Sequence, residues 1–215
     1  MKKTISTEDF IIILNDICKT IEDQKDYLSE LDRKIGDGDH GVTMNIGWMA
    51  VKEKLSTINP SDGFHKICTQ IASSFLSAVG ASAGPLYATA LMRGGGAVKD
   101  KNSLDAMSFS LFLNAAANGI KERGKAEIGD KTMLDVWIPA ADEMKKKASE
   151  GANLMEALEC TVNTAENAMN NTKNLLAKKG RSSKLGNRSI GHIDPGAASS
   201  FAIINSIFQT LKEMN

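Results

Sequence analysis

One stretch breaks the helical pattern of the first part of the chain: Asp32-Arg33-Lys34-Ile35-Gly36-Asp37-Gly38-Asp39-His40-Gly41-Val42-Thr43. Asp37 and Asp39 are separated by one glycine, and a chain that folds back here can bring Asp32 beside them. Clustered carboxylates repel one another unless a cation lies among them. A helix that begins near Gly41 would direct free N–H groups towards an anion. The stretch therefore predicts a loop that binds Mg2+ and a phosphate group.

Asp-Gly-Asp also has interpretations other than a Mg2+ site. The simplest is a solvated turn, in which aspartate and glycine are common. A calcium-binding EF-hand loop is another, but counting from Asp37 puts Gly41 at the fifth position and Trp48 at the twelfth, where such a loop needs ligand oxygens. The EF-hand is therefore excluded, and the solvated turn remains the alternative to a metal site.

The composition bounds the class of protein. The chain has 215 residues and no Pro/Ser-rich linker or change of composition, which predicts one domain over residues 1–215. Lysine plus arginine and aspartate plus glutamate both number 26, so no overall field favours nucleic acid or an anionic membrane as a partner. Any phosphate binding is therefore expected to be local.

The cysteines and the N-terminal segment indicate the compartment. Cys18, Cys68 and Cys160 lie far apart in apolar helical segments, where we expect buried thiols in a reducing environment. The apolar run Phe10–Leu14 is too short, and too crowded by acidic residues, for a signal peptide or a membrane span. A cytoplasmic protein is therefore expected.

Apolar residues at helical spacing predict an all-α protein with eight long helices. The expected segments are about 8–23, 42–58 and 64–79, a fourth of about a dozen residues that ends at Gly94, then about 103–122, 132–148, 153–177 and 197–214, with a short amphipathic piece at 27–31. Thr7 and Ser103 are expected to cap the first and fifth helices, and Gly94-Gly95-Gly96 to begin a loop. Short connections favour antiparallel neighbours around a shared core, in a bundle or a barrel.

The connections between the predicted helices differ in composition according to their order along the chain. In an up-and-down array, the first, third, fifth and seventh connections emerge at the same end. These four are rich in glycine and charged residues, and they comprise the acidic stretch, Gly80–Pro85, Arg123–Lys131 and Lys178–Gly196. Their basic residues are Arg123, Lys125, Lys131, Arg181 and Arg188, each of which taken singly is expected to be a solvated loop charge. Together the carboxylates and cations predict a nucleotide site at this end.

The chain lacks the motifs of several other enzyme classes. It has no G-x-x-x-x-G-K-[ST] P-loop, no protein-kinase motif set, no G-x-S-x-G elbow and no zinc motif. No nucleophile has an adjacent base, so no catalytic side chain is assigned. Any chemistry is expected to be metal-assisted phosphoryl transfer, in which positioning and charge neutralisation do most of the catalysis.

Four ordered motifs together resemble one family. They are Leu31-Asp32 with Ile35-Gly36-Asp37-Gly38-Asp39-His40-Gly41, then Gly84-Pro85-Leu86-Tyr87, then Arg123-Gly124-Lys125-Ala126-Glu127 with Gly129-Asp130-Lys131-Thr132-Met133, and finally Lys179-Gly180-Arg181 with Arg188-Ser189-Ile190-Gly191-His192 and Asp194-Pro195-Gly196-Ala197. Over nearly the whole chain they resemble the ADP-binding L subunits of phosphotransferase-system-dependent dihydroxyacetone kinases, which are equivalent to the nucleotide domains of ATP-dependent dihydroxyacetone kinases. One departure is Ala83, where the family usually has serine before the Gly-Pro pair; Ser82 stands one place earlier.

The resemblance implies a barrel of eight antiparallel helices that holds ADP or ATP and two Mg2+ ions at one end. By position, the implied metal ligands are Asp32, Asp37 and Asp39. The implied nucleotide contacts are His40, Gly41, Val42, Thr43, Ser82, Ala83, Gly124, Met133, Arg181, Asp194, Pro195 and Gly196.

The resemblance also implies an activity that needs partner chains. In the family, bound ADP receives a phosphoryl group from a phosphohistidine of the M subunit, and the group passes to dihydroxyacetone held by the K subunit. A homodimer is left open. The alternatives are a subunit of an ATP-dependent kinase that exchanges its nucleotide and acts on dihydroxyacetone or a related ketose, a non-catalytic regulator that senses ADP, and a structural helical bundle.

Overall fold

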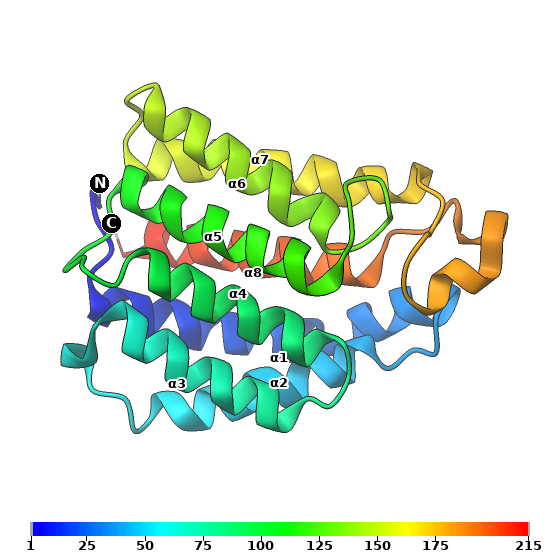
Figure 1. The fold of residues 1–215 in the computed structure, drawn as a ribbon, viewed down its shortest axis with the longest axis horizontal. Helices are drawn as coiled ribbons and strands as arrows, with labels where there is room; N and C mark the ends of the chain where they lie inside the picture. The colour runs from blue at the N-terminus through cyan, green and yellow to red at the C-terminus, as the bar shows by residue number, and fades with distance from the viewer. Residues whose placement is uncertain (1, 215) are drawn as a thin grey trace.

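Within residues 2–214, which the computed structural model describes, eight α-helices form a closed ring (Figure 1). They are α1 (Thr7–Ile35), α2 (His40–Leu55), α3 (Gly63–Ala78), α4 (Ala83–Ala97), α5 (Ala106–Gly124), α6 (Leu134–Ser149), α7 (Leu154–Asn171) and α8 (Pro195–Glu213), and the connections contain the short 3-10 helices η1 (Pro60–Asp62), η2 (Thr172–Asn174) and η3 (Arg181–Ser189). Each α-helix packs against its neighbours in sequence, and α8 packs against α1. The predicted all-α, antiparallel architecture is confirmed, and the ring is a barrel.

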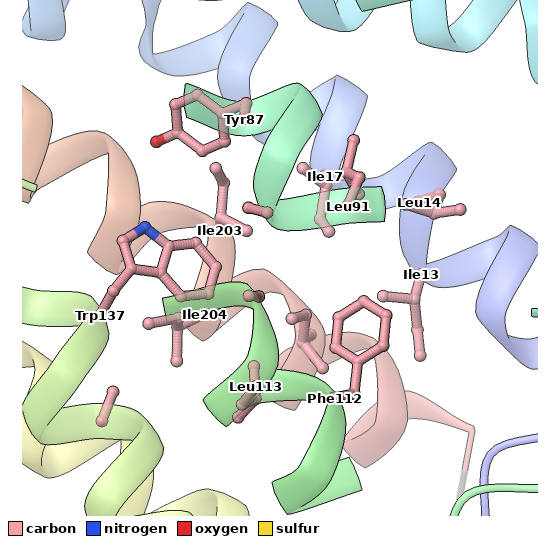
Figure 2. Close-up of a cluster of buried hydrophobic side chains, with 14 of the residues drawn as sticks. Ile13, Leu14, Ile17, Tyr87, Leu91, Phe112, Leu113, Trp137, Ile203 and Ile204 are labelled. Atoms are coloured by element: carbon pink, nitrogen blue, oxygen red, sulfur yellow. The ribbon is translucent and has the colours of Figure 1, made fainter. Parts of the chain in front are cut away.

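Apolar side chains fill the inside of the barrel. One continuous cluster of buried residues receives side chains from all eight α-helices. Figure 2 shows Ile17 of α1, Tyr87 of α4, Phe112 of α5, Trp137 of α6 and Ile203 of α8 in this cluster. Burial of each large apolar side chain contributes about 1.5–3 kcal/mol to folding. Burial of these apolar side chains in the interior therefore stabilises the closed ring of helices.

The first helix is longer than the sequence pattern predicted. Residues 8–23 and 27–31 were expected to form two pieces, but α1 runs unbroken from Thr7 to Ile35. The buried residues Ile21 and Leu28 lie one heptad apart, so they share a face of the helix, and the polar residues between them lie on its exposed sides. A polar run of this length therefore does not interrupt an amphipathic helix.

Two of the predicted caps were wrong by one or two residues. The N-cap of α1 is Ser6 and not Thr7: its hydroxyl accepts the N–H of Asp9 at 3.2 Å, and the Asp9 carboxylate accepts the N–H of Ser6 at 2.9 Å. The N-cap of α5 is Asp105 and not Ser103, because Leu104 is held extended by a backbone bridge to Ile5. In both cases a neighbouring residue with a suitable side chain takes the cap.

The triple glycine was predicted to begin a loop, but Gly94, Gly95 and Gly96 lie inside α4. A Cβ atom at Gly94 would lie 2.9 Å from the Phe112 ring, and one at Gly95 would lie 2.5 Å from the Cys68 Cβ. The glycines therefore allow α4 to pack closely against α3 and α5, and this packing outweighs their low helix propensity.

Helix α7 also differs from its prediction, because it ends at Asn171 and not at residue 177. Thr172, which begins η2, is completely buried, and the chain then leaves the barrel. Of the three cysteines, Cys18 and Cys68 are buried as predicted, whereas Cys160 is only half-buried.

The two ends of the barrel differ in their connections. The connections α1–α2, α3–α4, α5–α6 and α7–α8 lie at one end, on the right in Figure 1, which we call the open end. The other three connections and the two chain ends lie at the opposite end, which we call the closed end. None of the helices formed by residues 2–214 combines the length and the apolar character that crossing a bilayer requires.

Candidate functional site

A cavity of about 650 Å3 lies at the open end, and all four connections contribute to its wall. The lining residues are Asp32, Ile35, Asp37, Asp39, His40, Thr43, Ala81, Ser82, Ala83, Pro85, Leu86, Tyr87, Ile120, Arg123, Gly124, Ala126, Lys131, Thr132, Met133, Leu134, Lys179, Gly180, Arg181, Ser182, Asp194, Pro195 and Gly196. The glycine-rich and charged loops that lie far apart in the sequence therefore meet around one space.

Four helices begin at this cavity. Their first residues, His40 of α2, Ala83 of α4, Leu134 of α6 and Pro195 of α8, all line it. The N-cap residues of α2, α4 and α6 make no side-chain capping hydrogen bond, and the first turns of α2, α4 and α8 contain no acidic residue. The positive ends of four helix dipoles therefore favour a negatively charged ligand here.

Three carboxylates lie together on the wall formed by α1 and α2. One oxygen atom from each of Asp32, Asp37 and Asp39 lies within 4.8 Å of the others. Asp32 is 9% exposed, and its Oδ2 accepts the backbone N–H groups of Asp39 at 3.0 Å and His40 at 3.2 Å, which ties the end of α1 to the start of α2. Gly36 is required beside it, because a Cβ at this position would lie 2.1 Å from Asp32 Oδ1. Oxygen ligands in such a cluster suit a hard cation such as Mg2+.

A long segment of the α7–α8 connection reaches across the cavity to this acidic trio. The guanidinium group of Arg181, at the start of η3, forms an ion pair with the carboxylate of Asp37. The Arg181 side chain is 68% exposed and lines the cavity, so its guanidinium group is accessible from the cavity.

His40 is held in one orientation by α8. Its Nε2 lies 3.0 Å from the Ser199 hydroxyl oxygen, which in turn donates to the Gly196 carbonyl oxygen at 3.0 Å. In the tautomer that carries its proton on Nε2, His40 donates to this hydroxyl oxygen and Nδ1 is an acceptor. Burial lowers the pKa of His40 to about 4, against the opposing effect of the Asp32 carboxylate. The imidazole is therefore neutral at pH 7.

Asp194 caps α8 from inside the site. Its Oδ2 accepts the N–H of Ala197 at 2.8 Å, and its own N–H donates to the Thr172 hydroxyl oxygen at 3.0 Å. Burial raises the pKa of Asp194 to about 7, although the Ala197 N–H bond and the charge of Lys131 act in the opposite direction. The carboxyl group is therefore close to half-protonated at neutral pH.

Most of the residues implied by the family resemblance lie around this one cavity. Those on its wall are Asp32, Asp37, Asp39, His40, Thr43, Ser82, Ala83, Gly124, Met133, Arg181, Asp194, Pro195 and Gly196. Gly41 does not line the cavity, because it packs against the Lys25 carbonyl oxygen of α1, and the Val42 side chain is 47% exposed away from the wall. Either residue can therefore reach a ligand only through the backbone at the start of α2.

Sequence reasoning missed one residue that shapes the α5–α6 connection, Asp135, and misjudged the surroundings of another, Lys131. Asp135 is 5% exposed and its carboxylate accepts the N–H groups of Gly129 at 2.5 Å and Thr132 at 2.7 Å. The pattern Thr132-x-x-Asp135 is typical of a capping box and could have indicated it. Lys131 was expected to be a solvated charge, but it is 1% exposed.

Comparison with known proteins identifies the family. The model of the DAK2 domain matches residues 34–209. The chain belongs to the DAK2 domain family. Two relatives are similar to this chain over most of their own length. The ADP-binding subunit of the PEP-dependent dihydroxyacetone kinase of Escherichia coli (strain K12) is 40% identical over 191 residues, which make up 88% of this chain and 90% of that protein. The ADP-binding subunit of the PTS-dependent dihydroxyacetone kinase of Lactococcus lactis is 36% identical over 194 residues, 90% of each.

DAK2 domains also occur as parts of longer chains. The triokinase/FMN cyclase of Homo sapiens is 33% identical over 201 residues, which make up 94% of this chain and 35% of that protein. The crystal structure of the dihydroxyacetone kinase from C. freundii in complex with AMP-PNP and Mg2+ superposes with a TM-score of 0.72 over 93% of this chain and 33% of that chain, at 21% identity. The barrel described above is therefore the DAK2 fold.

Proposed function

We propose that this chain is the ADP-binding subunit of a dihydroxyacetone kinase that draws its phosphoryl group from the phosphoenolpyruvate-dependent phosphotransferase system. The observation that carries the proposal is the arrangement of the open end, where the acidic trio and four helix N-termini face one cavity. The relatives of nearly equal length that are named as ADP-binding subunits of such kinases support the same function. In this proposal residues 1–215 form a single nucleotide-binding domain.

Different groups of the chain would bind the metal ions and the nucleotide. Asp32, Asp37 and Asp39 would hold Mg2+, and two ions are proposed from the family resemblance. The ions would supply charge neutralisation between the phosphates of the nucleotide. N–H groups at the starts of α2, α4 and α8 would donate to phosphate and ribose oxygens, and the dipole of α6 would add to the positive field. The exposed Arg181 would pair with the terminal phosphate.

The nucleotide contacts proposed are those on the cavity wall together with the backbone of residues 41 and 42. Ser82 is exposed at the N-cap of α4 and makes no capping hydrogen bond, so its hydroxyl is available to a phosphate. Ala83, where the related subunits usually have serine, is buried at the first position of the helix. Ser82 would therefore replace the hydroxyl that the family usually provides one residue later.

The partner chains are also part of the proposal. A K subunit would hold dihydroxyacetone against the mouth of the cavity, and an M subunit would bring its phosphohistidine to the same opening. Bound ADP would stay in place while it accepts the phosphoryl group from one partner and gives it to the other. The chain would act only in the presence of both partners.

The test begins with the purified chain. The chain is dialysed against Mg2+ buffer and then denatured, and the released nucleotide is identified and counted. About one ADP per chain after dialysis supports an ADP that stays bound and relays the phosphoryl group. A chain that loses its nucleotide during dialysis and binds ATP reversibly would favour the second candidate, an ATP-exchanging kinase subunit. The exposed Arg181 side chain on the cavity wall is the feature that supports this second candidate.

A transfer assay then distinguishes an enzyme subunit from a regulator. Phosphoenolpyruvate, the general phosphotransferase proteins and cognate K and M subunits are combined with the chain, and dihydroxyacetone phosphate is measured. Product that requires this chain supports the proposal. Bound ADP without any product would leave only an ADP-sensing role.

A further inference from the structure

The connection between α5 and α6 contains two lysines with unusual backbone and opposite surroundings. Lys125 (φ 49°) and Lys131 (φ 61°) are the two residues other than glycine with positive φ within residues 2–214. Lys125 is exposed at the C-cap of α5, whereas Lys131 is 1% exposed and is the only buried lysine or arginine in the described part of the chain. A left-handed backbone at a non-glycine residue persists where surrounding contacts hold it.

Those contacts come from the α7–α8 connection. The Nζ of Lys131 donates to the carbonyl oxygen of Thr172 at 2.6 Å and to that of His192 at 2.5 Å. Thr172 follows the end of α7, and His192 lies just before α8. One side chain therefore joins the α5–α6 connection to both ends of the α7–α8 connection.

The same place carries a second link. The Thr172 hydroxyl oxygen accepts the N–H of Asp194, so the residue that Lys131 holds also holds the turn into α8. The carboxylates of Asp194 and Asp135 favour the charged ammonium, while burial lowers the pKa of Lys131. The ammonium group gives the His192 carbonyl oxygen a donor and adds a second donor to the Thr172 carbonyl oxygen, which also accepts the N–H of Leu175 at 3.1 Å.

We infer that Lys131 is a positioning residue for the nucleoside diphosphate: its ammonium group fixes residues 192–196 against the α5–α6 connection and so sets one wall of the cavity. That wall contains Met133, Asp194 and Gly196, with Gly196 packed next to the backbone of Met133. This inference rests on the proposed function, because the ligand it concerns is the nucleotide. It assigns Lys131 no contact with the reacting atoms.

The test compares two matched lysine substitutions in the full-length chain. Lys131→Met keeps the aliphatic stem and removes the ammonium, and Lys125→Met makes the same change at the exposed left-handed lysine 6 positions earlier. With Mg2+ present, calorimetry is expected to show an ADP Kd about tenfold higher for K131M and unchanged for K125M. Hydrogen exchange at saturating ADP is expected to be faster for residues 190–197 in K131M alone.

Stability is measured alongside affinity to separate positioning from folding. A lower Tm with an unchanged Kd, measured at a temperature where K131M is fully folded, would overturn the inference and leave a structural role. If K131M does not fold, Lys131→Gln, which keeps an N–H donor but no charge, is measured in its place with the same expected direction. Wild-type protein that binds no ADP would overturn the proposed function together with this inference, whereas wild type and K131M that bind ADP equally would overturn the inference alone.

Discussion

The two ends of the barrel begin their helices in different ways. At the closed end, α1, α5 and α7 are capped by their own side chains, from Ser6, Asp105 and Asn153, and α3 is the exception. At the open end, the N-cap residues of α2, α4 and α6 make no such bond, and α8 is capped by Asp194. The closed end caps its helices for folding. The open end directs four helix N-termini at the cavity, where part of the first N–H groups is bonded to the side chains of Asp32, Thr132 and Asp194. Substitutions at the two ends should therefore affect different measurements.

The largest effect is expected from the acidic trio. Asp37→Asn removes one charge of the proposed metal site, and loss of a charged ligand interaction of about 2–3 kcal/mol raises the Kd for ADP in Mg2+ about 100-fold. Asp62→Asn at the closed end is the matched control, because Asp62 pairs with the exposed Lys66 and not with a ligand. Calorimetry with equal affinities for both variants would show that the trio does not hold a cation.

A smaller loss of affinity is expected at the segment that crosses the cavity. Arg181→Met removes the cation proposed to meet the terminal phosphate, and the Kd for ADP should rise about tenfold, as for the loss of one charge-assisted hydrogen bond. Arg188→Met changes an exposed arginine of the same 3-10 helix that does not line the cavity, and it should leave the Kd unchanged. If both substitutions weaken binding alike, the charge of the whole segment matters and not the position of Arg181.

A cap at the closed end should affect stability alone. The Asn153 side chain accepts the N–H groups of Met155 at 3.0 Å and Glu156 at 3.1 Å. Asn153→Ala should reduce the free energy of unfolding by about 1 kcal/mol, which lowers Tm by about 2–4 °C in a chain of this size. Thermal unfolding and ADP calorimetry are measured on the same samples. A weakened ADP affinity in this variant would contradict the division between the two ends.

A pH dependence of stability is also expected to arise at the open end. The raised pKa of Asp194, about 7, means that between pH 4 and 7 the folded chain holds a proton that the unfolded chain releases. Stability from this group therefore falls as pH rises through 7. In the absence of Mg2+ and nucleotide, wild-type Tm should fall relative to that of Asp194→Asn between pH 5 and 8, since asparagine keeps the cap of Ala197 without titrating.

His40 provides an internal check on that experiment. Its pKa is lowered to about 4, so its contribution is constant at high pH and falls as pH drops below the ordinary histidine value. This contribution has the opposite direction to that of Asp194, and it is present in both proteins, so it cancels in the difference. Parallel Tm curves for wild type and Asp194→Asn would mean that Asp194 is charged throughout.

Features set by neighbours in sequence were predictable. Asp32, Asp37 and Asp39 lie on the two sides of one turn, so their spacing alone predicted a carboxylate cluster, and the geometry agrees. The alternating character of the connections predicted that the open end would gather charged loops, which the cavity wall confirms. The assignment of these residues as metal and nucleotide ligands stays a prediction.

Features set by contacts between distant segments were not predictable. Gly94 was expected to leave the helix because glycine has a low helix propensity, but the Phe112 ring occupies the space of its missing side chain. Lys131 was expected to be solvated because lysines usually are, and only the carbonyl groups of Thr172 and His192, far along the chain, explain its burial. Closure of the ring by α1 and α8 likewise depends on a pairing that no local pattern records.

The position of the chain ends has a practical consequence. Lys2 and Met214 meet through a contact of 3.9 Å between Nζ and Sδ, at the face of the barrel farthest from the cavity. An affinity tag, a fluorophore or a fused reporter attached at either end would leave the mouth unobstructed. The ends could also be joined by a short glycine linker and the chain reopened at the Glu150–Ala152 turn, giving a circular permutant that keeps the cavity wall whole.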